Sequence, residues 1–239
     1  MKNLKNLLIV FGLIILTACS DSNEENVIDN IDRDLSEVND DLVERLNDVV
    51  LPANLTSNSN LGAQQTTAIF STFQALGTSF TTLFNIPANA SSRQANVSSR
   101  NSNTLNSQTY TWSDGVTTVN YTISELIDRF TFVYDVAGPE FTGKFMDGYN
   151  LKDGSYAEFN IYDTENGGVA LNFKLTVTST SVTCEFTDND GNRSILVSNS
   201  DGSGNLEIYE NNTLTIRSTW NANGSGTLTD FSSGETFTW

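Results

Sequence analysis

The stretch Val169-Ala-Leu-Asn-Phe-Lys-Leu-Thr-Val177 decides the fold of this chain. Its odd-numbered positions hold Val, Leu, Phe, Leu and Val, whereas its even-numbered positions hold Ala, Asn, Lys and Thr. Successive side chains of a β-strand point to opposite faces, so this alternation predicts a strand with one buried and one solvated face. Residues 156–162 repeat the pattern, with Ala157, Phe159 and Ile161 on the apolar side. Such strands are typical of an antiparallel sheet with one face in water.

Similar runs continue from residue 109 to residue 239, and turn dipeptides separate many of them. These dipeptides are Asp114-Gly115, Asp153-Gly154, Gly167-Gly168, Asp190-Gly191, Asp201-Gly202 and Asn223-Gly224. They supply the positive φ angles that tight hairpins require, and short hairpin links make neighbouring strands pair antiparallel. We therefore expect a large antiparallel meander of about ten strands over residues 109–239, curled or forming an open barrel.

The residues before this sheet carry a helical period instead. From Glu24 to Val50, apolar side chains recur three and four positions apart on a very acidic background, which predicts an amphipathic helix. A second helix is predicted over Leu61–Ile86, which contains no charged residue. Its apolar face holds Ile69, Phe73, Leu76, Phe80, Leu83 and Phe84. The expected class is therefore α+β, with N-terminal amphipathic helices covering the apolar face of the sheet.

Both helices have alternative partners. The apolar stripe of residues 24–50 packs either on the body of the protein, which we favour, or in a coiled coil with a second copy. The helix at Leu61–Ile86 could instead span a membrane, but its many Thr, Ser and Gln side chains disfavour this interpretation. Residues 85–108 are rich in Ser and Asn and are expected to form a linker or long loop.

The N-terminus has the pattern of an export signal. Lys2 and Lys5 precede an apolar run from Leu7 to Leu16 that is too short to span a bilayer comfortably. Leu16-Thr17-Ala18-Cys19 follows, and this order resembles the lipobox of bacterial lipoproteins. The resemblance implies that Cys19 carries a diacylglycerol and becomes the first residue of the mature protein.

The acidic residues 20–25 resemble the short tag behind the lipidated cysteine in surface-exported lipoproteins of the Bacteroidota. This resemblance implies a lipid-anchored outer-membrane protein displayed at the cell surface, with the periplasmic face as the alternative. The expected organisation is a lipoprotein signal peptide at 1–18, an acidic tether at 19–26, a helical segment and linker at 27–108, and the β domain at 109–239.

Composition narrows the possible functions. The chain has no histidine, which excludes Ser-His-Asp and Cys-His catalysis and the usual zinc ligand sets. Removal of the signal peptide changes the net charge from −17 to −19, because Lys2 and Lys5 are lost, and such a surface repels nucleic acid. Carboxylate chemistry of the glycosidase kind stays open through Glu158 and Glu207, but their flanking residues do not distinguish an acid from a base. We therefore favour a protein that is not an enzyme.

Polar and aromatic residues on the solvated face form a candidate ligand-binding set. These residues are Tyr156, Tyr162, Tyr209, Glu158, Asn160 and Arg217. Aromatic rings beside amide and carboxylate groups suit a sugar or another polar ligand, although tyrosine is also a favoured residue of exposed strands.

A second set, Asp188, Asp190 and Asn192, has the alternating oxygen ligands of a calcium loop. An EF-hand counted from Asp188 requires glycine at its sixth position and glutamate at its twelfth, but Arg193 and Asn199 stand there. A hairpin turn is the simpler interpretation, so calcium is a weak candidate and we expect no other cofactor.

The sequence therefore favours a lipid-anchored protein with a non-catalytic, β-rich domain that binds a glycan, a peptide or an envelope protein. One alternative is a structural or assembly subunit of an envelope complex that docks through residues 24–50. Another is a carrier of lipid or another hydrophobe, with a pocket between the sheet and the Leu61–Ile86 helix.

Overall fold

A computed structural model of the chain describes residues 35, 38, 44, 49–94, 104–165 and 167–239. The expected signal peptide, the lipidation site at Cys19 and the acidic tether lie outside these residues. Most of the predicted first helix, residues 24–50, lies outside them as well.

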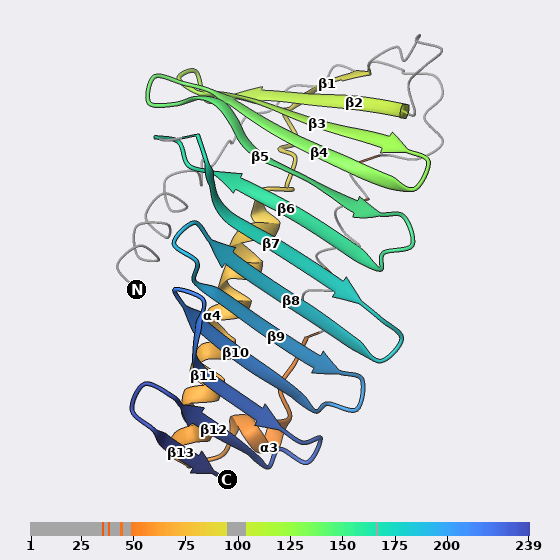
Figure 1. Ribbon diagram of the computed structural model, residues 1–239. Helices are drawn as coiled ribbons and strands as arrows, with labels where there is room; N and C mark the ends of the chain where they lie inside the picture. The colour runs from red at the N-terminus through yellow and green to blue at the C-terminus, as the bar shows by residue number, and fades with distance from the viewer. Residues whose placement is uncertain (1–34, 36–37, 39–43, 45–48, 95–103, 166) are drawn as a thin grey trace.

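Thirteen strands form a single sheet, and each strand pairs antiparallel with its neighbours in the chain (Figure 1). The strands are β1 (Ser91–Gln94), β2 (Thr104–Ser113), β3 (Thr118–Leu126), β4 (Arg129–Ala137), β5 (Thr142–Leu151), β6 (Tyr156–Tyr162), β7 (Val169–Val177), β8 (Ser181–Asp188), β9 (Arg193–Asn199), β10 (Gly204–Glu210), β11 (Thr213–Trp220), β12 (Gly226–Asp230) and β13 (Glu235–Thr238). The predicted antiparallel meander is confirmed, with thirteen strands instead of about ten. Because β1 and β13 each have one neighbour, the sheet does not close on itself.

The sheet begins earlier than expected. β1 and the first residues of β2 lie within residues 85–108, where we expected a linker. All four side chains of β1 are polar and exposed. Period-two alternation detects a strand only when one of its faces is buried, so it does not detect this one.

Several of the predicted turn dipeptides form hairpins with a shared hydrogen-bond pattern. In Asp201-Gly202-Ser203 and Asn223-Gly224-Ser225, the two glycines have φ angles of 86° and 85°. The serine of each turn donates both its backbone N–H and its hydroxyl to the side-chain oxygen of the residue two positions before it. Positive φ at glycine and this serine bridge together make the chain reverse within a few residues.

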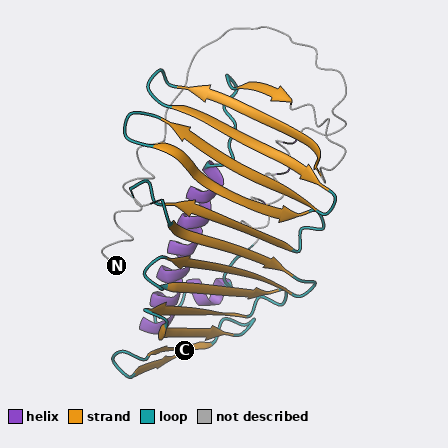
Figure 2. Ribbon diagram, turned by 45° about the horizontal axis from the view of Figure 1, so that its top comes forward, coloured by secondary structure: helices purple, strands orange, loops and turns teal. Residues whose placement is uncertain are grey.

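Helix α4 (Leu61–Thr82) crosses one face of the sheet (Figures 1 and 2). It follows the short helix α3 (Ala53–Thr56), which begins after Pro52. Near its start, the Asn60 side-chain amide donates a hydrogen bond to the carbonyl of Thr238 at 3.0 Å. Beyond its end, the ring of Phe84 lies 5.0 Å from that of Phe159. None of the helices within the described ranges is long and apolar enough to cross a membrane.

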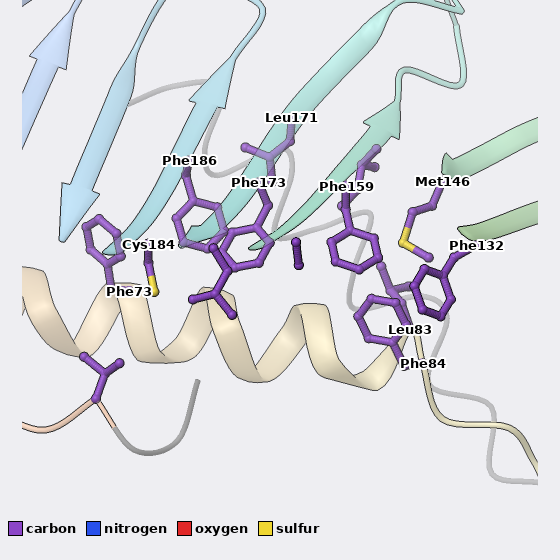
Figure 3. Packing of buried hydrophobic residues seen from close by; sticks show 14 of the residues in the cluster. Phe73, Leu83, Phe84, Phe132, Met146, Phe159, Leu171, Phe173, Cys184 and Phe186 are labelled. Atoms are coloured by element: carbon purple, nitrogen blue, oxygen red, sulfur yellow. The ribbon is translucent and has the colours of Figure 1, made fainter. Parts of the chain in front are cut away.

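A row of phenylalanines on neighbouring strands forms the centre of the core under α4 (Figure 3). Phe159 of β6, Phe173 of β7 and Phe186 of β8 occupy paired positions. The ring of Phe73, which comes from α4, lies 5.6 Å from Phe186 in an edge-to-face arrangement. Cys184 is buried beside this row, and burial raises the pKa of its thiol to about 12, so the thiol stays protonated and unreactive.

Three side chains from the N-terminal part of the chain also belong to this core. Leu35, Val38 and Val49 are each at most 4% exposed and pack in the same hydrophobic cluster. Their burial is consistent with the favoured packing of residues 24–50 on the body of the protein.

A hydroxyl pair is buried where α4 crosses β11. Thr66 and Ser218 are both 0% exposed, and their side-chain oxygens lie 2.7 Å apart. Thr66 also donates its hydroxyl proton to the carbonyl of Gly62 at 2.9 Å, so Ser218 is the donor in the pair. Both buried hydroxyls therefore have an acceptor, and that of Ser218 depends on Thr66.

We predict that Thr66→Val destabilises the protein by about 1–3 kcal/mol, because the buried hydroxyl of Ser218 loses its acceptor. Combining it with Ser218→Ala removes the orphaned hydroxyl, so the double variant should be more stable than the sum of the two single changes predicts. A double-mutant cycle of urea denaturation measures this coupling. If the destabilisation by the double variant equals the sum of the two single changes, the hydrogen bond from Ser218 to Thr66 is contradicted.

Candidate functional site

The face of the sheet opposite α4 carries polar side chains in register across neighbouring strands. Asp147, Asn160 and Asn172 occupy paired positions on β5, β6 and β7. Tyr149, Glu158 and Lys174 form the next row on the same strands. We call this surface the polar face. Its groups lie close enough to form cross-strand pairs, because paired residues in a sheet are direct neighbours.

One cluster on the polar face combines a tyrosine, a carboxylate and a cation. The Tyr162 hydroxyl and the Lys144 ammonium both donate to Oδ2 of Asp147 at 2.9 Å. Burial raises the pKa of Asp147, but hydrogen bonds from Lys144, Asn160 and Tyr162 outweigh it and hold this pKa below its ordinary value. Lys144 also lies 5.4 Å from the centre of the Tyr162 ring. We call this cluster the Asp147 triad.

A second cluster has the same composition. The Tyr156 hydroxyl donates to Oε2 of Glu158 at 3.0 Å, and Nζ of Lys174 lies 3.9 Å from Oε1 of Glu158. Partial burial and this bond to Glu158 raise the pKa of Tyr156, so its phenol stays protonated at neutral pH. The ring of Tyr149 lies 5.7 Å from that of Tyr156 and has the Arg129 guanidinium above it at 5.0 Å. We call Tyr156, Glu158 and Lys174 the Glu158 triad.

Two side-chain amides join these clusters. The Nδ2 atom of Asn172 donates to Oε1 of Glu158 at 3.1 Å and to Oδ1 of Asn160 at 2.8 Å. Asn160 in turn donates to Oδ1 of Asp147 at 3.1 Å. A continuous hydrogen-bond network therefore runs from Tyr156 to Tyr162 across three strands. It fixes the rotamers of its members before any ligand arrives.

A third triad lies farther along the polar face. The Tyr209 hydroxyl donates to Oε2 of Glu207 at 2.6 Å, and Nε of Arg217 donates to Oε1 at 2.8 Å. The bond from Tyr209, together with that from Arg217, holds the pKa of Glu207 below its ordinary value. The Arg193 guanidinium lies 4.2 Å from the centre of the Tyr209 ring. We call Tyr209, Glu207 and Arg217 the Glu207 triad.

All six predicted ligand-binding residues lie on the polar face, but they do not form one site. Tyr156, Glu158, Asn160 and Tyr162 lie together on β6. Tyr209 and Arg217 lie on β10 and β11, and β10 is four strands away from β6. At about 4.8 Å per strand, that separation is about 19 Å. The same separation places Glu158 and Glu207 well beyond the roughly 5–9.5 Å that paired glycosidase carboxylates require.

Sequence reasoning missed several members of these triads, including Asp147, Lys144 and Lys174. Asp147 was missed because of a β-bulge. The register between β4 and β5 shifts there, so the consecutive residues Phe145 and Met146 are both buried. Strict alternation counted from Lys144 would have placed Asp147 on the core side. Two consecutive apolar residues inside an otherwise alternating run are the sequence signal for such a bulge.

The candidate calcium ligands lie at the turn between β8 and β9, and they are Asp188, Asp190 and Asn192. The Oδ1 atom of Asp188 accepts hydrogen bonds from the backbone N–H groups of Asp190 and Asn192, each at 2.9 Å. Its Oδ2 atom accepts a bond from the Asn192 side chain at 2.8 Å. These contacts support the hairpin interpretation. No group of three or more His, Cys, Asp or Glu suited to a metal occurs among the residues that the structure describes, and calcium binding stays a prediction.

No protein-family profile matches the chain, and no curated protein resembles it significantly. Function is therefore inferred from the geometry of the polar face together with the N-terminal sequence pattern.

The Asp147 carboxylate predicts a specific dependence of stability on pH. Its folded-state pKa lies below the ordinary value of 3.8, so it contributes stability above about pH 4 that is lost as pH falls through the folded pKa. We predict that Asp147→Asn makes the free energy of unfolding less steeply dependent on pH between about pH 4 and pH 2. Tyr162→Phe removes one of the donors and should give an intermediate slope. Parallel curves for all three proteins in denaturant titrations would contradict this role of Asp147.

Proposed function

We propose that this protein is a lipid-anchored protein of the bacterial outer membrane, displayed at the cell surface, whose polar face binds a ligand without converting it. The observation that carries the proposal is the repeated triad, in which a tyrosine hydroxyl, a carboxylate and a cation are fixed on a solvent-facing surface. α4 lies along the apolar face of the later strands, so the opposite, polar face is the surface on which a ligand would find arranged polar groups (Figure 2).

The membrane part of the proposal rests on the sequence. Leu16-Thr17-Ala18-Cys19 supplies the lipobox, and the acidic residues 20–25 supply the surface tag. Each acyl methylene adds about 0.8 kcal/mol of membrane affinity, so several chains hold the protein durably while the sheet stays in water. Anchoring on the periplasmic face is the alternative orientation.

Binding is favoured over catalysis because of the state of the carboxylates. A general acid needs a raised pKa, whereas the pKa values of Asp147 and Glu207 are lowered by their hydrogen bonds. Both groups are therefore ionised at neutral pH and serve as fixed acceptors. The absence of histidine from the sequence removes the commonest general base.

Two aromatic contacts favour the binding surface over a hydrophobe carrier. The carrier hypothesis requires space between α4 and the sheet near Phe73 and Phe84. The Phe84 ring instead makes edge-to-face contacts with Phe132 at 5.9 Å and with Phe159 at 5.0 Å (Figure 3). Side chains therefore fill this part of the interface. The assembly-subunit alternative depends on residues 24–50, most of which lie outside the described residues.

We predict that Cys19→Ser abolishes lipidation. The wild-type protein expressed in a bacterium of the Bacteroidota should incorporate labelled palmitate and resist extraction by salt, and the variant should do neither. Cys184→Ser serves as the matched control, because its thiol is buried and plays no part in anchoring. Protease added to intact cells then distinguishes surface display from the periplasmic orientation. Equal palmitate labelling of wild type and Cys19→Ser would refute the anchor.

We also predict that ligand binding depends on the triads. The purified full-length protein is screened against arrays of glycans, peptides and envelope proteins, and bound ligands are retested with Tyr156→Ala and Tyr209→Ala. A ligand of the polar face should lose at least about tenfold in affinity with one of these variants, since the loss of one well-placed aromatic contact costs more than about 1.4 kcal/mol. Thr219→Ala, on the same face but outside the triads, should bind normally. If every ligand binds both tyrosine variants as tightly as wild type, the polar face is not the binding surface.

A further inference from the structure

We propose that the polar face binds an extended neutral polysaccharide that crosses the strands and contacts the triads in succession. This inference rests on the proposed function and names its ligand class. It begins from a repetition: the Asp147, Glu158 and Glu207 triads have the same three chemical components, although their residues come from five different strands. A ligand with repeating units is the natural partner for a surface with repeating sites.

Each triad places a hydrogen-bond donor next to an acceptor. The distances from cation nitrogen to carboxylate oxygen are 2.9 Å for Lys144, 3.9 Å for Lys174 and 2.8 Å for Arg217. Two vicinal hydroxyls of a sugar ring present two oxygens at a comparable spacing, so one hydroxyl accepts from the cation while its neighbour donates to the carboxylate. The tyrosine of each triad adds apolar area for the C–H groups of the ring.

The charges favour a neutral ligand. Seven Lys and Arg residues occur in the described ranges, and six of them lie on the polar face, namely Arg93, Arg129, Lys144, Lys174, Arg193 and Arg217. Five carboxylates on the same face nearly balance them, namely Asp135, Asp147, Glu158, Glu185 and Glu207. The polar face is therefore close to neutral, although the whole chain carries a net charge of −17. Polyanions approaching it meet the repulsion of the surrounding protein.

The shape of the sheet favours a long ligand. Thirteen strands in one row, at about 4.8 Å each, give a face about 58 Å long. The Glu158 and Glu207 triads lie about 19 Å apart along this row, a span of several sugar residues. One polymer that contacts both gains avidity over any short fragment.

A peptide strand fits this surface less well. Strand addition requires a free sheet edge, whereas β6 and β10, which carry Glu158 and Glu207, are each paired on both sides. A ligand at the triads therefore meets side chains alone. These side chains are polar, whereas the centre of a protein–protein interface is depleted in charged residues.

The test measures affinity against ligand length. Full-length protein in detergent is titrated by calorimetry with a β-glucan, an α-glucan and a mannan, each as disaccharide, octasaccharide and polymer. One of these series should bind, with the polymer at least a hundredfold tighter than the disaccharide. Glu158→Gln and Glu207→Gln should each lower the polymer affinity about tenfold, and the double variant should bring it close to that of the short fragment. The matched control is Glu235→Gln, which removes one charge from β13 outside the triads.

Several results would overturn the inference. The inference fails if the affinity does not rise with the length of the ligand, or if only one of the two glutamate variants loses affinity. It also fails if none of the three polysaccharides binds. Unchanged circular dichroism and melting temperature show that the variants are folded. If a peptide or protein from the arrays binds and the tyrosine variants lose it, the polysaccharide inference fails while the proposed binding function stands. If nothing binds to the polar face, both fail.

Discussion

The structure depends on the packing of one uncharged helix against the aromatic row of one sheet. An antiparallel sheet of a single layer has an apolar face that must be removed from water, and α4 together with the residues just after it covers that face through Phe73 and Phe84. The rings interlock edge to face with Phe186, Phe132 and Phe159, an arrangement that fixes the helix in position along the sheet. The apolar face therefore stabilises the fold, whereas the opposite face presents polar side chains to solvent.

This division explains why the polar face can hold an ordered network. A hydrogen-bonded carboxylate such as Asp147 stabilises a protein only when its donors are held in place, and the paired backbones of β5, β6 and β7 hold Tyr162, Asn160 and Asn172 at fixed spacing. The backbone geometry is maintained from the opposite side, by the core. Polar groups on the face are therefore ordered without being fully buried, so a ligand that binds them loses little free energy to the ordering of side chains.

Much of the fold follows from the sequence, because its elements satisfy simple periodic rules. The alternation around Phe159 and Phe173 predicted strands, and the Asp-Gly and Asn-Gly pairs predicted the hairpins between them. The rules failed where their physical basis was missing, as at β1, whose side chains are all exposed, and at the bulge beside Met146. The triads were harder to predict, since pairs such as Tyr162 with Asp147 depend on cross-strand register. A single sequence indicates which residues share a face but not which of them meet.

The hydrogen bond between Asn60 and Thr238 joins residues 178 positions apart, whereas every strand pairs with its immediate neighbours in the chain. The sheet is therefore able to form one hairpin at a time as the chain is synthesised, because each pairing closes only a short loop. The start of α4 is made early but finds its strands only after β12 and β13 have been made. The first turns of α4 therefore stay without their partners through most of the chain's synthesis, which makes them a segment of the nascent protein that a chaperone would protect.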